Sequence, residues 1–566
     1  MTSHVLALAF LLHACTALAW QETNSRSVVA HLDSGIIRGV PRSADGIKFA
    51  SFLGVPYAKQ PVGELRFKEL EPLEPWDNIL NATNEGPICF QTDVLYGRLM
   101  AASNREMSEA CIYANIHVPW QSLPRVRGTT PLRPILVFIH GGGFAFGSGH
   151  EDLHGPEYLV TKNVIVITFN YRLNVFGFLS MNTTKIPGNA GLRDQVTLLR
   201  WVQRNAKNFG GDPSDITIAG QSAGASAAHL LTLSKATEGL FKRAILMSGT
   251  GMSYFFTTSP LFAAYISKQL LQILCNQRDG SEEIHRQLID LPAEKLNEAN
   301  AVLIEQIGLT TFLPIVESPL PGVTTIIDDD PEILIAEGRG KNVPLLIGFT
   351  SSECETFRNR LLNFDLVKKI QDNPTIIIPP KLLFMTPPEL LMELAKTIER
   401  KYYNGTISID NFVKSCSDGF YEYPALKLAQ KRAETGGAPL YLYRFAYEGQ
   451  NSIIKKVMGL NHEGVGHIED LTYVFKVNSM SEALHASPSE NDVKMKNLMT
   501  GYFLNFIKCS QPTCEDNNSL EVWPANNGMQ YEDIVSPTII RSKEFASRQQ
   551  DIIEFFDSFT SRSPLE

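Results

Sequence analysis

Short, continuous runs of apolar residues recur along the chain, and they predict buried β-strands. The clearest runs are residues 134–139, 164–169, 215–219, 243–247, 343–348 and 440–445. A strand covered by helices on both faces has this pattern, because neither face meets water. Helix-compatible segments lie between several runs, and residues 193–205 carry apolar side chains at helical spacing. This alternation predicts an α/β protein with a large, mostly parallel sheet.

The first part of the chain has a different pattern. Residues 28–40 and 46–57 alternate around glycines, which predicts antiparallel strands at one edge of the sheet. A set of buried helices is the alternative interpretation, and the short, β-branched runs disfavour it. No repeat, low-complexity linker or long charge run divides the chain into modules.

The composition argues against several classes of protein. Of 566 residues, 51 are Lys or Arg and 60 are Asp or Glu, so the formal net charge is −9. A nucleic-acid partner is not expected, because binding phosphates requires a clustered basic excess. Hydrophobic residues make up 44% and charged residues 20%, which is ordinary globular usage. A disordered chain and a multi-pass membrane protein are therefore disfavoured.

The N-terminus predicts secretion. Residues 5–18 are almost wholly apolar, and Ala-Leu-Ala at 17–19 is the small-x-small pattern of a signal-peptidase site. We expect a signal peptide at 1–19 and a single mature domain at 20–566. Residues 1–4 lack Lys and Arg, so a buried N-terminal strand or helix is the alternative. No later run is long enough to span a membrane, and the C-terminus carries no retention or lipid-anchor signal, so no membrane partner is expected.

Cysteines and sequons fit an extracellular compartment. Seven of the eight cysteines follow residue 19, so at least one is unpaired in the mature chain. Sequence does not settle how Cys275, Cys354, Cys416, Cys509 and Cys514 pair, although the last two could bond to each other. Acceptor sequons begin at Asn81, Asn182, Asn404 and Asn517, and these four asparagines are candidate glycosylation sites.

The candidate chemistry begins at Gly-Gln-Ser-Ala-Gly, residues 220–224. This pentapeptide directly follows the apolar run at 215–219 and opens a helix-like stretch at 225–233. A strand, a tight turn and a helix are the context in which G-x-S-x-G presents a nucleophile, here Ser222, at the carboxyl edge of a sheet.

An upstream glycine loop predicts an oxyanion hole. His-Gly-Gly-Gly-Phe at 140–144 follows the run that ends at residue 139. Three glycines let backbone N–H groups converge on one point, so Gly142, Gly143 and Ala223 are the predicted donors. A plain flexible turn is the alternative for the loop taken alone.

The serine needs a base, and the base needs an acid, in the chain order Ser, acid, His. Glu353 follows the run at 343–348 and is favoured over Glu355, which lies deeper in the next segment. Among the later histidines, His467 lies in a glycine-rich loop in the pattern Gly-x-x-His-x-x-Asp and is favoured over His462. His229, His285 and His485 are interpreted as surface histidines.

These motifs resemble the carboxylesterase and cholinesterase family of α/β-hydrolases over nearly all of the mature chain. Further family-like signatures occur at residues 52–58, 65–67, 108–113, 170–174 and 191–195. The resemblance implies an α/β-hydrolase fold and the same roles for Ser222, Glu353 and His467 and for the three oxyanion donors. It also implies a disulfide between Cys89 and Cys111.

Departures from the family narrow the substrate. Residues 90–110 contain no tryptophan to stack on a quaternary ammonium, so a choline ester is not expected. Gln221 stands before the serine where general carboxylesterases usually have glutamate. With Arg66-Phe67, Asp194-Gln195 and the His467 loop, it resembles the motif set of insect juvenile hormone esterases of the moth type. That resemblance implies a small hydrophobic ester partner, juvenile hormone, in a haemolymph-like fluid.

Two rival functions share the fold. A broad-specificity carboxylesterase acting on xenobiotic or odorant esters has the same triad. A non-catalytic adhesion relative is disfavoured by the intact Ser, Glu and His. No zinc-spaced ligand cluster and no P-loop is visible, so neither a metal nor another cofactor is expected.

Overall fold

The computed structural model describes residues 28–93, 105–123, 131–274, 281–308, 311–450, 452–479, 488–514 and 522–560. The signal segment at 1–19, Cys275, His485 and Asn517 lie outside the described residues.

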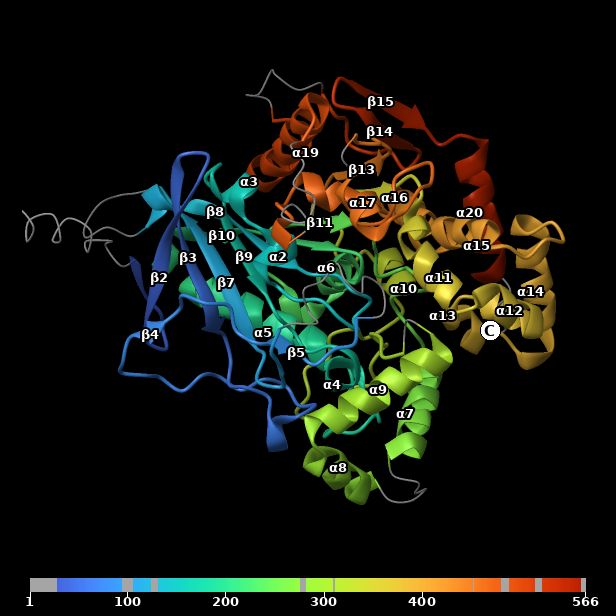
Figure 1. Ribbon diagram of the computed structural model, residues 1–566, viewed down its shortest axis with the longest axis horizontal. Coiled ribbons are helices and arrows are strands. Elements are labelled where there is room, and N and C mark those ends of the chain that lie inside the picture. Colours follow the sequence, from blue (N-terminus) through green and yellow to red (C-terminus); the bar gives the residue numbers. More distant parts are fainter. Residues whose placement is uncertain are drawn as a thin grey trace, which may run out of the picture.

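One large, twisted sheet organises the described chain (Figure 1). The strand order is β1-β2-β3-β7-β9-β8-β10-β11-β12-β13-β14-β15, with β4 beside β2. The strands are β1 Val28–His31, β2 Ile36–Ala44, β3 Ile47–Pro56, β4 Leu80–Asn81, β7 Tyr113–Pro119, β8 Arg133–Ile139, β9 Ile165–Phe169, β10 Gly211–Gln221, β11 Arg243–Met247, β12 Leu345–Thr350, β13 Leu440–Phe445, β14 Gln530–Ser536 and β15 Ile539–Glu544. A separate pair is formed by β5 Ile88–Cys89 and β6 Met107–Ser108.

The directions of the strands match the two sequence patterns. Every neighbouring pair from β9 to β14 is parallel. The pairs β1–β2, β2–β3, β3–β7, β7–β9 and β14–β15 are antiparallel. The mostly parallel sheet with an antiparallel N-terminal edge is therefore confirmed.

Helices cover the sheet. They are α2 Glu151–His154, α3 Glu157–Val160, α4 Asn174–Phe178, α5 Ala190–Asn205, α6 Ala223–Leu233, α7 Pro260–Leu274, α8 Ser281–Asp290, α9 Ala293–Ile307, α10 Pro331–Ala336, α11 Arg358–Asn363, α12 Leu366–Asp372, α13 Pro380–Met385, α14 Pro388–Tyr402, α15 Ile409–Cys416, α16 Tyr423–Thr435, α17 Ile453–Met458, α19 Glu490–Cys509 and α20 Ser547–Thr560. None of the described helices combines the length and the hydrophobicity that crossing a bilayer requires.

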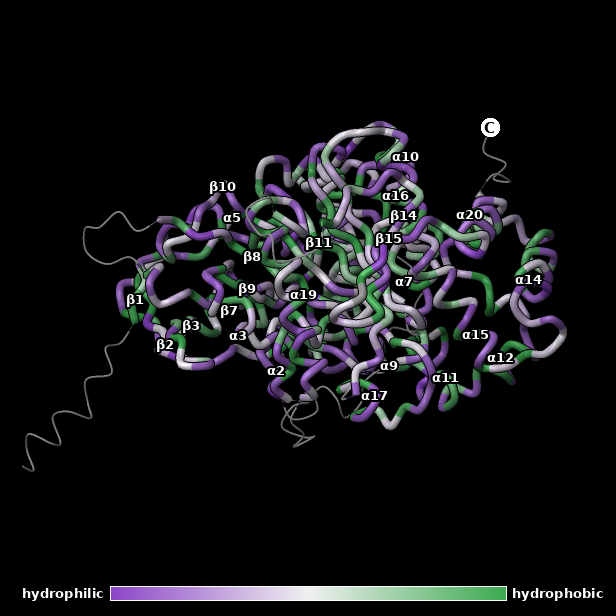
Figure 2. The backbone as a smooth tube through the Cα atoms, turned by 90° about the horizontal axis from the view of Figure 1, so that it is seen from above, coloured by the Kyte–Doolittle hydropathy of each residue, from purple (hydrophilic) through white to green (hydrophobic). Residues whose placement is uncertain are grey.

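The two faces of the sheet pack into different hydrophobic cores. On β8, Ile135 and Val137 belong to a core shared with α5, α6 and α16, whereas Leu136 and Phe138 belong to a second core shared with α3 and α19. Successive side chains of a strand point to opposite faces, so a strand between two helical layers must be apolar throughout. Figure 2 accordingly shows hydrophobic colour along the central strands. This double burial holds the strand ends that carry the site.

Candidate active site

The predicted nucleophile, Ser222, lies in a tight turn between β10 and α6. Its backbone has φ 58° and ψ −125°, an unusual conformation for a residue with a side chain. Its N–H donates to the carbonyl of Met247 on the neighbouring strand over 2.8 Å. The turn therefore places Ser222 at the carboxyl edge of the sheet, directly before the N-terminus of α6.

The glycines on either side of the serine are required by close packing. A Cβ on Gly220 would lie 2.2 Å from the carbonyl carbon of Gly224, and a Cβ on Gly224 would lie 2.1 Å from the carbonyl oxygen of Ile139. Any side chain at either position would force the strand and the helix apart. The spacing of the pentapeptide is thus a packing requirement of this turn.

The structure brings Glu353 and His467 together. Oε2 of Glu353 lies 2.5 Å from Nδ1 of His467, and both side chains are about 1% exposed. Glu353 begins η6 (Glu353–Phe357) just after β12, and His467 lies in the loop between α17 and η9 (Glu469–Tyr473). Oε1 of Glu353 accepts the backbone N–H of Thr350 over 2.7 Å, which fixes the carboxylate. Such a pair holds an imidazole in one orientation and one tautomer.

Two further carboxyl groups, two and three residues after His467, begin η9 (Glu469–Tyr473). Burial raises the pKa of Glu469 and the pKa of Asp470 to about 7 each, and the charge of Glu353 adds to the effect on Asp470. The hydroxyl of Tyr443 donates to Oδ2 of Asp470 over 2.9 Å. Sequence reasoning noted this aspartate only as part of the His467 motif.

The predicted oxyanion loop lies against the serine. A Cβ on Gly141 would be 3.0 Å from Cβ of Ser222, so the loop and the elbow touch. Gly142 and Gly143 have φ values of 110° and 62°, and Ala223 is the first residue of α6. The loop is held by Tyr171, whose hydroxyl donates to the carbonyl of His140 over 2.9 Å.

Gln221 contributes a contact that sequence reasoning missed. Its Nε2 lies 3.0 Å from Nε2 of His467, and its side chain is buried. The only signal in the sequence was its position directly before the serine.

The histidines rejected for the triad are only partly as predicted. His462 is half-buried, and its Nδ1 contacts the carbonyl of Glu463. The surface interpretation was wrong for His229, which is 1% exposed, because α6 is buried along its whole length. It was also wrong for His285, which is 7% exposed and shares the buried face of α8 with Leu288. Burial lowers the pKa of His229 to about 3.

Three disulfides join described cysteines. Cys89 bonds to Cys111, the pairing that the resemblance implied. Cys354 bonds to Cys416, and Cys509 to Cys514.

Several family-like signatures form buried ion pairs. Arg66 binds both carboxylate oxygens of Glu109, at 2.6 and 2.5 Å, and also donates to the carbonyl of Leu288. Arg172 binds both oxygens of Asp194 at 2.8 and 2.6 Å. Such bidentate pairs fix the segments that carry them. These motif residues therefore support the structure around the site.

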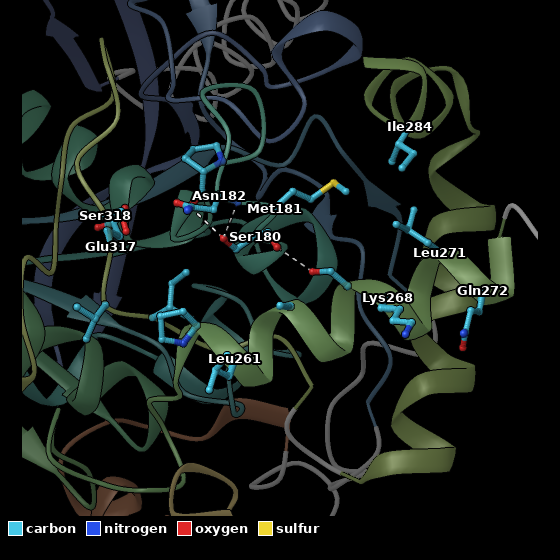
Figure 3. A pocket seen from close by; sticks show the side chains of 16 residues that line it. Ser180, Met181, Asn182, Leu261, Lys268, Leu271, Gln272, Ile284, Glu317 and Ser318 are labelled. Carbon is cyan, nitrogen blue, oxygen red and sulfur yellow. Dashed lines mark hydrogen bonds between the residues drawn. The ribbon is translucent and has the colours of Figure 1, made fainter. Parts of the chain in front are cut away.

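A cavity of about 830 Å³ lies along α7 (Figure 3). Its walls include Leu261, Lys268 and Leu271 of α7, Ile284 of α8 and Met181. Ser267 Oγ on this wall donates to the carbonyl of Ser180 over 2.8 Å. None of Ser222, Glu353 and His467 lines this cavity. No group of three or more His, Cys, Asp or Glu residues able to hold a metal ion occurs among the residues that the structure describes.

Comparisons with known proteins agree with this architecture. The model of the carboxylesterase family matches residues 25–549. A juvenile hormone esterase of Heliothis virescens is 98% identical over 566 residues, which cover all of both chains. The crystal structure of a juvenile hormone esterase of Manduca sexta, with OTFP covalently attached, superposes with a TM-score of 0.90 at 55% identity, and it covers 95% of this chain and 100% of its own. Esterase FE4 of Myzus persicae is 32% identical over 92% of this chain and 90% of its own.

The chain belongs to the carboxylesterase family, with an α/β-hydrolase fold. It is a carboxylic-ester hydrolase.

Proposed function

We propose that this chain is a serine esterase that hydrolyses the methyl ester of juvenile hormone to the hormone acid and methanol. The observation that carries the chemistry is the Glu353–His467 pair, 2.5 Å apart, whose imidazole contacts Gln221, the residue before Ser222, over 3.0 Å. The substrate rests on the full-length likeness to the Heliothis virescens juvenile hormone esterase. Likeness to the Manduca sexta structure supports the same assignment.

In the proposed mechanism, Ser222 is the nucleophile, His467 the base and Glu353 the acid. Nε2 of His467 takes the hydroxyl proton as Oγ of Ser222 bonds to the ester carbonyl carbon. The N–H groups of Gly142, Gly143 and Ala223 hold the negative oxygen that develops. The imidazolium returns its proton to the leaving methoxide, which departs as methanol. His467 then activates a water that releases the hormone acid from Ser222.

We further propose secretion, with a signal peptide at 1–19 and a single domain at 20–566 that acts in a haemolymph-like fluid. Asn81, Asn182 and Asn404 are exposed, which supports glycosylation at their sequons. Three disulfides support an oxidising compartment. We expect no nucleic-acid or membrane partner.

Turnover of juvenile hormone tests the proposal. We expect high kcat/KM on radiolabelled hormone at nanomolar concentration, lost in Ser222→Ala. An organophosphate should label the parent protein at Ser222 and leave the variant unlabelled. If hormone turnover is poor while naphthyl esters are hydrolysed fast, the alternative of a broad-specificity carboxylesterase replaces this substrate. Labelling that is equal in Ser222→Ala would contradict the assigned nucleophile.

A further inference from the structure

The side chain of Gln221 lies between two parts of the candidate site. Gln221 ends β10, and its Nε2 is 3.0 Å from Nε2 of His467. On the other side, a Cβ on Gly141 would lie 2.7 Å from Oε1 of Gln221. The carboxamide therefore fills the space between the first glycine of the oxyanion loop and the imidazole.

The contact involves the nitrogen that the proposed reaction uses. Nδ1 of His467 faces Glu353 and must carry a proton to bind that carboxylate. In the neutral imidazole, Nε2 then has only a lone pair, and this lone pair must accept the proton of Ser222. Among the described residues, Ser222 Oγ makes no hydrogen bond, and Nε2 contacts Gln221. Gln221 thus occupies the acceptor position in the resting site.

A carboxamide suits this position because it carries both a donor and an acceptor. Its NH₂ group donates to the neutral imidazole. After Nε2 has taken the serine proton, the carboxamide oxygen can accept from the new N–H if the group turns over. A carboxylate has only acceptors and favours the imidazolium alone.

The choice between a carboxamide and a carboxylate at position 221 affects the protonation of His467, because carboxylates already lie near its ring. Glu353 contacts Nδ1 of His467. Asp470, three residues after His467 on η9, acts electrostatically on the same ring. The ring of Tyr421 packs at 4.8 Å from the imidazole, and the ring of Phe357 at 5.4 Å. A further carboxylate at position 221 would put negative charge at Nε2 as well, and a protonated imidazole cannot act as the base.

We propose that Gln221 is a positioning residue that holds the imidazole of His467 neutral by donating to its free nitrogen in the resting site, and that gives up this hydrogen bond to the hydroxyl of Ser222 when the serine proton is transferred. The inference rests on the proposed triad. It also gives a chemical reason for having glutamine, where general carboxylesterases usually have glutamate, directly before the serine. The glutamine affects whether the base is protonated.

The decisive variant is Gln221→Glu. We expect the acid limb of its kcat/KM–pH profile to move to higher pH by about one unit, because an opposite charge within hydrogen-bond distance favours the imidazolium. At high pH, kcat/KM should recover toward the parent value. Gln430→Glu is the charge control: Gln430 lies within α16 and contacts Met529, and its variant should keep the parent profile.

Gln221→Met tests the hydrogen bond from residue 221 separately from the charge at that position. Methionine fills similar space without a donor, so we expect kcat to fall about tenfold at all pH values, with the acid limb unmoved. A thermal melt of each variant shows whether it is folded. If Gln221→Glu and Gln221→Met lose the same activity at every pH, Gln221 only fills space and the proposal is wrong.

A spectroscopic titration keeps this test independent of turnover. In the Ser222→Ala background, the low-field proton resonance of the His467 Nδ1–H reports protonation of the ring. Adding Gln221→Glu should move the midpoint of that titration upward by about the same unit as the kinetic limb. An unmoved midpoint would overturn the inference while leaving the proposed function untouched. A moved midpoint with no turnover of juvenile hormone by the parent protein would count against the proposed function alone.

Discussion

The carboxylate of Glu353 and the imidazole of His467 are joined by more than their 2.5 Å contact. The backbone N–H of His467 also donates to the carbonyl oxygen of Glu353 over 3.0 Å, and the hydroxyl of Thr356 donates to the carbonyl of His467 over 3.0 Å. Backbone and side-chain bonds thus fix the loop between α17 and η9 to the segment that follows β12. The two residues are 114 positions apart, and their relative placement is a property of the parallel sheet.

We expect Glu353→Gln to lower kcat by about 10³ to 10⁴, with a small change in KM. A carboxamide stabilises the imidazolium poorly and permits the wrong tautomer, and the corresponding change in a serine protease triad has an effect of about this size. Steady-state kinetics on juvenile hormone measure it.

Glu355→Gln is the matched control for that variant. Glu355 is also buried, but it binds Arg358 at 2.6 Å instead of the histidine. We expect its kcat to stay within a few-fold of the parent value. Equal losses in both variants would argue that Glu353 acts only through folding.

Alanine substitutions at two neighbouring glycines of the oxyanion loop should destabilise the fold by different amounts. In Gly142→Ala, the new Cβ would lie 2.0 Å from the carbonyl oxygen of Phe146, so the loop must move and both folding and kcat should suffer. At Gly143, no atom lies within 4 Å of a new Cβ. Gly143→Ala should therefore fold with a stability loss of only about 1 kcal/mol for the left-handed backbone. Thermal melts and kcat of the two variants test this; equal melting points would contradict it.

The fold could be predicted because its signals are local. A strand buried on both faces is apolar throughout, and runs such as 243–247 needed no knowledge of their partners. The order of strands could not be predicted, since it depends on contacts between distant segments. The pairing of Cys354 with Cys416 is of this kind, because α15 is brought beside η6 only in the folded chain.

The candidate site likewise has features with local sequence signals and features that depend on contacts between distant residues. Ser222 and the oxyanion loop have short signatures, because close backbone packing demands glycine at fixed spacing. The contact of Gln221 with His467 spans 246 residues and leaves no pattern beyond the glutamine itself. His229 was misassigned because its helix is buried on all sides, and a polar residue in such a helix looks like a surface residue in sequence alone.

Two of the disulfides, Cys354–Cys416 and Cys509–Cys514, should stabilise the folded chain by different amounts. Cys354–Cys416 closes a loop of 62 residues, and Cys509–Cys514 closes one of 5. Loop-closure entropy gives about 4 kcal/mol for the first and about 2 kcal/mol for the second. The paired Ser variants, Cys354→Ser with Cys416→Ser and Cys509→Ser with Cys514→Ser, should lose stability in that order on urea unfolding. The reverse order would show that native-state packing outweighs chain entropy here.

The pH dependence of stability tests the environment of Asp470. Burial raises the pKa of this carboxyl to about 7, from an ordinary value of 3.8. Between about pH 4 and pH 7 the folded chain therefore holds a proton that the unfolded chain releases. The stability that this carboxyl contributes is full below about pH 4 and is lost as the pH rises through 7, with a slope of at most about 1.4 kcal/mol per pH unit.

Asp470→Asn should remove this dependence, because the carboxamide does not titrate and can still accept from Tyr443. The stability of the parent relative to Asp470→Asn should fall as the pH is raised from 5 to 8, measured by urea unfolding at each pH. Other buried groups titrate in both proteins and cancel in this difference. Asp551→Asn, at an exposed carboxyl paired with Lys401, should give a difference that is flat with pH. The curves of unfolding free energy against pH could instead run parallel for the parent and Asp470→Asn. The carboxyl of Asp470 would then be ionised in the folded protein throughout this range, and burial beside Glu353 would not raise its pKa.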